Sequence, residues 1–212
     1  METVWLDCVE YRRALDLQLS YVDRRARGET QDTLLLLTHP HVYTFGRGGN
    51  PANLLMPEEA LLREGIFVER VGRGGDVTYH GPGQLVGYPI IYLAHPDLHR
   101  FVRCLEAALI EALETFGVRS CRIEGMTGVW AGGKKIASIG LAIRRWISFH
   151  GFAFNWATNM AHFGLITPCG LQGVEMTSLK EILGESVSRS YVEERICRHF
   201  EVVFRINLNS LT

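Results

Sequence analysis

The sequence has few lysines, no closely paired cysteines and no long apolar run. Only three of its 212 residues are lysine, and its five cysteines are scattered singly. Without a Cys-x-x-Cys pair, neither a disulfide framework nor a zinc site is indicated. No apolar stretch approaches the roughly 20 residues that a bilayer span requires, and the start of the chain lacks the pattern of a signal peptide. We therefore expect a protein of the reducing cytoplasm with no membrane segment.

The sequence also lacks an excess of charge of either sign. Its formal net charge is −1, which gives no electrostatic basis for binding nucleic acid or an anionic membrane. Hydrophobic residues make up 47% and charged residues 21% of the chain, a balance typical of globular proteins. No repeat, low-complexity tract or linker interrupts it. We expect residues 1–212 to form a single domain.

Two common kinds of nucleotide site are missing from the sequence. No Gly-x-Gly-x-x-Gly leads from a strand into a helix, and no phosphate-binding loop of the Gly-x-x-x-x-Gly-Lys-Ser/Thr type occurs. The histidines of HPH (39–41) and HPDLH (95–99) have no third ligand at useful spacing. We therefore expect neither a metal ion nor another cofactor.

Hydrophobic periodicity predicts more strands than helices. Neighbouring strands look like hairpins rather than β-α-β units, which predicts an α/β (α+β) fold with a mixed, largely antiparallel sheet and flanking helices. Asp97 is expected to cap one helix, and Ser190 with Glu193 to form the capping box of the last. The expected helices span residues 11–28, 57–65, 98–117 and 190–203. The expected strands span residues 3–8, 33–39, 41–46, 66–71, 77–79, 84–93, 118–123, 127–131, 134–143 and 147–156.

The stretch GRGGDVTYHGPGQLVGYP, residues 72–89, carries the first indication of a binding site. It holds six glycines and two prolines, although the residues between them are typical of strands. Glycine weakens a strand unless something must lie close to the backbone. We therefore expect a ligand beside this stretch, near Arg73 and His80.

The strand ISFHGFAFNW, residues 147–156, carries a second indication. Strict alternation places His150 with Phe152 on one face, and Gly151 with Ala153 on the other. Together with Gly140 on the partner strand, these small residues would leave a groove for a slim apolar chain. Burial in such a groove gains about 0.8 kcal/mol per methylene. Close packing of a helix on the sheet is the alternative explanation.

Cys169 differs from the other cysteines because it lies in ITPCG, where proline and glycine favour a sharp, accessible turn. A thiol on such a turn is a candidate nucleophile if a neighbouring group stabilises its thiolate. His80, His150 and Lys135 are candidates for that partner, and spacing alone does not choose among them. An incidental loop cysteine remains the alternative.

Three stretches together resemble the lipoyl(octanoyl) transferases: RGGDVTYHGPGQLVGYP, KIASIGLAIRRWISFHGFAFN and ITPCG. The resemblance implies the fold of the biotin/lipoate protein ligase catalytic domain. It also implies that Cys169 carries the acyl group as a thioester and that Lys135 activates it. The substrate pocket implied by the resemblance comprises Arg73, Gly74, Gly75, Asp76, Val77, Thr78, Tyr79, His80, Ser138, Ile139, Gly140, Gly151, Phe152 and Ala153.

The resemblance also implies a reaction and its partners. Such enzymes move an octanoyl group from octanoyl-acyl carrier protein to a lysine of the lipoyl domains of 2-oxoacid dehydrogenase E2 subunits and of the glycine cleavage H protein. We expect a cytoplasmic monomer of this kind, without a cofactor. The alternatives are an ATP-dependent lipoate or biotin protein ligase, a non-catalytic module that binds the acyl carrier, and a thiol hydrolase.

Two adjacent lysines compete for the activating role. In a strand Lys134 and Lys135 point to opposite faces, and Lys135 shares its face with the apolar row Ala137, Ile139, Leu141 and Ile143. Alternation alone does not exclude Lys134. The register of the resemblance favours Lys135.

Overall fold

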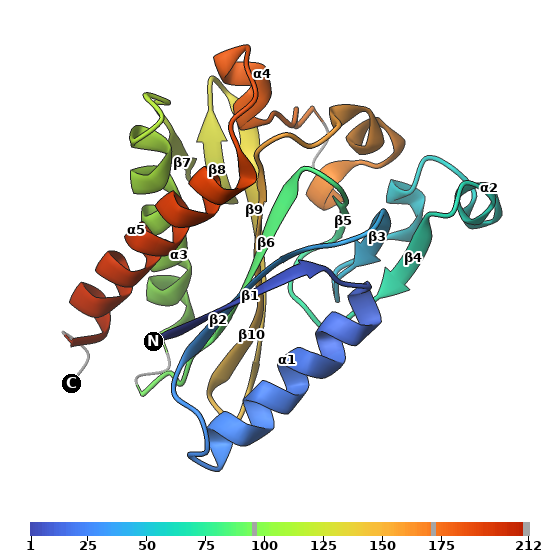
Figure 1. The fold of residues 1–212 in the computed structure, drawn as a ribbon. Coiled ribbons are helices and arrows are strands. Elements are labelled where there is room, and N and C mark those ends of the chain that lie inside the picture. Colours follow the sequence, from blue (N-terminus) through green and yellow to red (C-terminus); the bar gives the residue numbers. More distant parts are fainter. Residues whose placement is uncertain (95–96, 171–172, 210–212) are drawn as a thin grey trace.

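The main sheet of the protein has seven strands in the order β1-β2-β6-β10-β9-β8-β7 (Figure 1). This arrangement comes from a computed structural model that describes residues 1–94, 97–170 and 173–209. β1 pairs in parallel with β2, and the other neighbours are antiparallel. The strands are β1 (Glu2–Cys8), β2 (Thr33–Thr38), β6 (Gln84–Ile90), β7 (Cys121–Ile123), β8 (Met126–Ala131), β9 (Lys134–Arg144) and β10 (Ile147–Asn155).

A second, smaller sheet has the order β4-β3-β5 and combines β3 (Val42–Phe45), β4 (Phe67–Arg70) and β5 (Val77–His80). β3 runs parallel to β4 and antiparallel to β5. The chain leaves the main sheet around Pro40, after β2, and returns to it through Gly81–Gly83, before β6. The predicted mixed, largely antiparallel architecture is confirmed, although its strands divide between two sheets rather than one.

Helices cover both faces of the main sheet (Figure 1). On one face, α3 (Leu98–Glu114) and α5 (Arg189–Asn209) close a core that contains Phe152 and Phe154 of β10. On the other, α1 (Tyr11–Ala26) buries Ala14 and Val22 against β2 and β6. The short elements are α2 (Glu58–Arg63), α4 (Leu179–Leu183), and the 3-10 helices η1 (Pro51–Asn53), η2 (Met160–Leu165) and η3 (Pro168–Gly170). Within the described ranges, no helix is both long enough and apolar enough to cross a membrane.

Two helix starts test the capping predictions. The side chain of Asp97 accepts a hydrogen bond from the amide of Arg100 at 2.9 Å, as predicted for α3. The capping box of Ser190 with Glu193 is wrong, because α5 begins at Arg189 and the hydroxyl of Ser188 faces the amide of Tyr191. Arg189 instead pairs with Glu193 at 2.6 Å and donates to the carbonyl of Leu6. These bonds hold the start of α5 beside β1, and the serine at its start is Ser188, two residues before the predicted Ser190.

Candidate functional site

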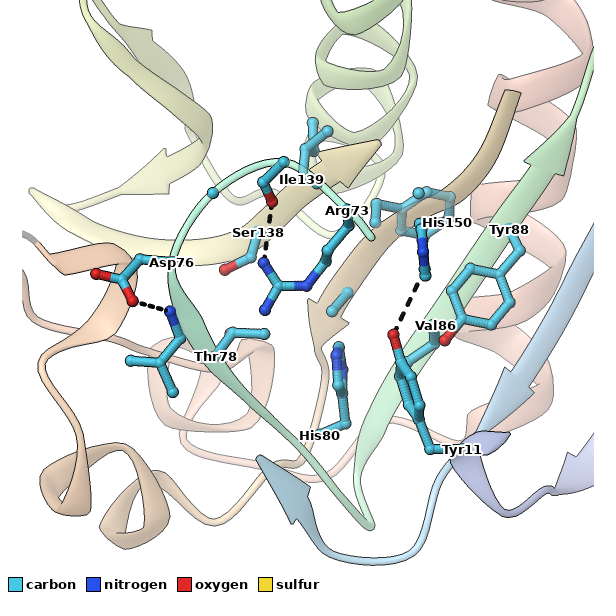
Figure 2. A pocket seen from close by; sticks show the side chains of 17 residues that line it. Tyr11, Arg73, Asp76, Thr78, His80, Val86, Tyr88, Ser138, Ile139 and His150 are labelled. Carbon is cyan, nitrogen blue, oxygen red and sulfur yellow. Dashed lines mark hydrogen bonds between the residues drawn. The ribbon is translucent and has the colours of Figure 1, made fainter. Parts of the chain in front are cut away.

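A pocket lies where the loop before β5 meets the middle of β9 and β10 (Figure 2). Asp76 lies at one end of it and the Tyr11–His150 pair at the other, with Arg73 between them. All but one of the residues that the resemblance assigns to the substrate pocket line this cavity. They are Arg73, Gly74, Gly75, Asp76, Val77, Thr78, His80, Ser138, Ile139, Gly140, Gly151, Phe152 and Ala153.

Tyr79 is the exception, because alternation along β5 turns it away from the pocket. Its hydroxyl lies 2.6 Å from Nδ1 of His41, and its ring stacks on that of His162 with the centroids 4.7 Å apart. Burial raises the pKa of Tyr79 well above that of a solvated tyrosine. Tyr79 belongs to the core of the second sheet and packs on the face of β5 that is turned away from the pocket.

Arg73 places a buried guanidinium group in the pocket wall. Its Nη2 donates to the carbonyl and the hydroxyl of Thr44, at 2.6 and 2.8 Å, and its Nη1 donates to the carbonyl of Gly74 at 3.0 Å. Arg73 therefore connects β3 to the glycine-rich loop. Its positive charge adds to burial in lowering the pKa of both His80 and His150.

The far end of the pocket is a cluster of buried histidines and tyrosines. Nε2 of His39 lies 2.7 Å from the hydroxyl of Tyr88, and the hydroxyl of Tyr11 lies 3.4 Å from Nδ1 of His150. Burial lowers the pKa of His39 to about 4 and that of His150 to about 3, and it raises the pKa of Tyr11 to about 12. These side chains are therefore neutral at pH 7. In the described part of the chain, no three His, Cys, Asp or Glu side chains gather as metal ligands would.

The buried histidines predict a loss of stability in mild acid. The unfolded chain takes up protons near pH 6.5, whereas native His39 and His150 take them up only near pH 4 and 3. Stability is therefore complete above about pH 6.5 and falls by up to about 1.4 kcal/mol per pH unit for each histidine as the pH drops below it. Urea unfolding between about pH 7 and pH 5 measures this slope. His39→Gln should reduce it, and an unchanged slope would contradict a neutral His39 in the native state.

The alternation predicted for β10 is wrong at His150. This residue has a φ of 55°, in the left-handed region that non-glycine residues rarely occupy. Its ring contacts that of its neighbour Phe149, with centroids 4.9 Å apart, and those of Tyr11 and Tyr88 on the α1 side of the sheet. The backbone amide of His150 donates to Oε1 of Gln18 at 2.7 Å. This bond from α1 holds the unusual backbone in place.

The room expected at Gly140 and Gly151 is already taken by the protein itself. A Cβ at Gly151 would lie against the carbonyl oxygen of Gly87 and 2.6 Å from Cδ of Pro89, both in β6. A Cβ at Gly140 would lie 3.0 Å from the carbonyl oxygen of Gly74 and 3.1 Å from Cδ of Arg73. Both glycines line the pocket, but they allow close backbone packing and do not leave an empty groove. The expectation of open space at these two positions is therefore wrong.

Gly151→Val should destabilise the protein by about 1–3 kcal/mol, because the added atoms meet the fixed backbone of β6. The measurement is the free energy of unfolding in urea. Gly164→Val is the matched control, since nothing lies within 4 Å of a Cβ at that position. Normal stability of Gly151→Val, with a changed preference for acyl-chain length, would restore the groove interpretation.

The two lysines of β9 lie in different surroundings, as the alternation predicts. Lys134 is half exposed, and its Nζ lies 2.6 Å from a carboxylate oxygen of Glu175. Lys135 is 2% exposed, and its Nζ lies 5.5 Å from the centre of the Trp130 ring. The stem of Lys135 fits a notch at Gly128, where a Cβ would lie 2.5 Å from its Cε. Lys135 therefore places a buried ammonium group on this strand, whereas Lys134 lies at the surface.

The turn that carries Cys169 packs beside the Asp76 end of the pocket. Cys169 lies in η3, which contacts β5, and its side chain is outside the described part of the structure. The amide of Thr167, just before η3, donates to the carbonyl of Asn53 at 2.8 Å. A Cβ at Gly170 would meet Oδ2 of Asp76. The fold thus brings the backbone of this turn next to a residue of the glycine-rich stretch.

The sequence does not identify four of the residues that line the pocket. They are Tyr11, Val86, Tyr88 and His150. Tyr11 lies at the start of the expected helix 11–28, and the sequence indicates His150 as a candidate partner for the thiol but not as a lining residue. A signal was present in the second case, since a histidine in an otherwise apolar strand requires an explanation. No local pattern separates Val86 or Tyr88 from ordinary core residues.

Known proteins resemble this chain along most of its length. Residues 10–201 match the family described as lipoyl protein ligase A/B catalytic domain. A relative from Caldicellulosiruptor saccharolyticus named Octanoyltransferase is 47% identical over 208 residues, which cover 96% of this chain and 88% of the relative. Another Octanoyltransferase, from Syntrophobacter fumaroxidans, is 48% identical and covers 94% of this chain and 88% of its own length.

Solved structures show the same fold at much lower sequence identity. A crystal structure of lipoate-protein ligase A bound with ATP superposes with a TM-score of 0.78 at 17% identity, covering 96% of this chain and 85% of that chain. The biotin protein ligase of Aquifex aeolicus gives a TM-score of 0.56 at 12% identity, over 97% of this chain and 69% of that one. The predicted resemblance and the predicted ligase-like fold are both confirmed. This chain belongs to the lipoyl protein ligase A/B catalytic domain family.

Proposed function

We propose that the protein is an octanoyltransferase. It moves an octanoyl group from octanoyl-acyl carrier protein to a lysine of a lipoyl domain, through a thioester on Cys169. One observation carries the proposal: three distant stretches of the chain, 73–78 with His80, 138–140 and 151–153, line one pocket beside the turn of Cys169. Relatives that are 47% and 48% identical and bear the name Octanoyltransferase support the choice of acyl group.

The chemistry of the pocket suits a neutral acyl chain. Its apolar lining includes Val77, Val86, Ile139 and Phe152, and the histidines at its far end are neutral at pH 7. Each methylene buried there contributes about 0.8 kcal/mol. The guanidinium of Arg73 donates to protein oxygens, including those of Thr44, which makes its burial beside the chain tolerable.

The proposed reaction has two half-reactions. The thiolate of Cys169 attacks the thioester carbon of the octanoyl group, a carbon–sulfur bond forms, and the thiol of the carrier leaves with a proton. The amine of the acceptor lysine then attacks the new thioester, gives an amide and returns the thiol of Cys169. The buried ammonium of Lys135 is suited to stabilise the thiolate and to move protons in both steps. Thioester to amide is downhill, so no ATP is consumed.

The acceptors in this proposal are the lipoyl domains of 2-oxoacid dehydrogenase E2 subunits and the glycine cleavage H protein. Residues 1–212 would act as one monomeric domain in the cytoplasm. Four cysteines have described side chains, Cys8, Cys104, Cys121 and Cys197, and all four are free thiols. This supports a reducing compartment.

Three other functions are possible on this fold. An ATP-dependent ligase would activate a free acid, and the ATP-bound structural neighbour, at 17% identity, bears on the fold alone. A non-catalytic carrier-binding module would form no covalent adduct. A thiol hydrolase would release free octanoate whether or not an acceptor is present.

The test is to incubate the protein with octanoyl-acyl carrier protein and weigh it intact, with and without a lipoyl domain. We expect an octanoyl adduct on the enzyme when the acceptor is absent. Adding the acceptor should move this mass to the lipoyl domain, without ATP. Transfer that requires ATP, or an enzyme that never gains the mass, would refute the proposal.

A further inference from the structure

The carboxylate of Asp76 is bonded to the segment that carries η1. Its Oδ1 accepts from the backbone amides of Asn50, at 3.0 Å, and Val77, at 2.6 Å, and its Oδ2 accepts from Nδ2 of Asn53. Asp76 is buried and lines the pocket at the start of β5 (Figure 2). A carboxylate that accepts several N–H bonds is held firmly in one orientation. One side chain therefore joins the pocket wall to η1.

The same segment is joined to the chain that leads into η3. The carbonyl of Asn53 accepts from the amide of Thr167 at 2.8 Å, and the amide of Leu55 donates to the carbonyl of Leu165 at 2.9 Å. Leu54 and Ile166 form an antiparallel bridge between these two bonds. Asn53 thus contacts Asp76 through its side chain and the approach to η3 through its backbone.

Gly170, the last residue of η3, packs against the side chains of Asp76 and Asn53. A Cβ on this residue would lie 2.5 Å from Oδ2 of Asp76 and 3.1 Å from Nδ2 of Asn53. Its φ of 67° also favours glycine. The backbone of Gly170 therefore rests directly on the hydrogen bond between the two side chains. The turn is held before Cys169 through Thr167 and after it through Gly170.

We propose that Asp76 and Asn53 form a positioning pair that sets the turn Pro168–Gly170 for acylation. The inference rests on the proposed function, because it gives the pair a role in that reaction. Thioester attack requires the thiolate at a near-attack distance and angle, and a displacement of about 1 Å can cost about 10²-fold in rate. Asp76 also lines the acyl pocket, so a single carboxylate relates the turn to the place where the acyl chain would lie.

Exchanging donor and acceptor within the pair gives a sharp test. Asn53→Asp places a second carboxylate next to that of Asp76, and the two repel each other. The substitution should slow acylation by about ten- to a hundredfold at saturating donor. Adding Asp76→Asn to that variant restores one donor, one acceptor and the original net charge. The double variant should recover to within a few-fold of wild type.

Two measurements separate a positioning role from a purely structural one. The first is the single-turnover rate of adduct formation with octanoyl-acyl carrier protein, followed by intact mass. The second is hydrogen exchange, which should speed up at residues 165–170 in Asn53→Asp and return to normal in the double variant. Asp97→Ala is the stability control, because it removes the cap of α3 far along the chain and should leave acylation unchanged.

The outcomes distinguish this inference from the proposed function. A wild-type protein that forms no adduct refutes the function and the positioning role together. Normal acylation by Asn53→Asp, or faster exchange at residues 165–170 without slower acylation, overturns the positioning role alone. Failure of the double variant to recover also overturns it, provided that thermal unfolding shows the variant to be folded.

Discussion

Cys169→Ala is expected to abolish both formation of the octanoyl adduct and transfer to a lipoyl domain. Without the thiol there is no acyl-enzyme, and direct attack by the acceptor lysine would need both proteins in one pocket at once. Activity should fall to the uncatalysed background. The measurement is intact mass for the adduct and acceptor mass for the transfer, both at saturating donor.

Two other cysteines provide matched controls. Cys104 lies in the main core, where burial raises the pKa of its thiol, and the thiol of Cys197 lies 3.3 Å from the hydroxyl of Thr3. Cys104→Ala and Cys197→Ala should lower stability at most, because these thiols act as packing groups. Transfer at a normal rate by Cys169→Ala would exclude the proposed covalent mechanism.

Lys135→Ala is expected to slow adduct formation by about 10²- to 10⁴-fold, the range typical of a lost acid–base group. Its ammonium is buried beside Trp130, whereas that of Lys134 reaches an exposed carboxylate. Lys134→Ala should keep most activity, since an exposed ion pair contributes about 0–1 kcal/mol. Single-turnover acylation measured for both variants decides between the two lysines.

The cavity left by Lys135→Ala could slow the reaction through packing alone. Lys135→Met separates the loss of packing from the loss of charge, because methionine refills the notch at Gly128 but carries no charge. We expect Lys135→Met to be as slow as Lys135→Ala while it unfolds at nearly the wild-type temperature. An active Lys135→Met, or a slow Lys134→Ala beside a fast Lys135→Ala, would assign the chemistry to another group.

Local patterns predicted most of the elements of this fold. The cap at Asp97, the hairpin turn expected at residues 144–146 and the strand break at Pro40 all follow from short-range preferences. The structure contains each of them, with Arg144 as the last residue of β9. The division into two sheets was not predictable, because it depends on which strands pair across long stretches of chain. β3 leaves its sequence neighbour β2 and pairs with β4 and β5 instead.

The candidate site, like the division into two sheets, could be predicted from the sequence only in part. The resemblance indicated residues 73–80, but only the three-dimensional packing shows that Tyr79 turns away and that His150 breaks alternation. The contact of Asn53 with Asp76 joins residues 23 positions apart through a side-chain bond. Periodicity carries no information about such pairs, since it describes which face a residue occupies and not what lies opposite.

The central position of β10 in the main sheet has a consequence for synthesis. This strand fills the gap between β6 and β9, although residues 84–90 leave the ribosome long before residues 147–155. Until then, the backbone N–H and C=O groups along one edge of β6 have no partner strand, and such edges readily pair with other chains. Pairings over this sequence distance also form slowly, since a long loop must close first. That edge of β6 therefore stays open to pairing with other chains until β10 has been made.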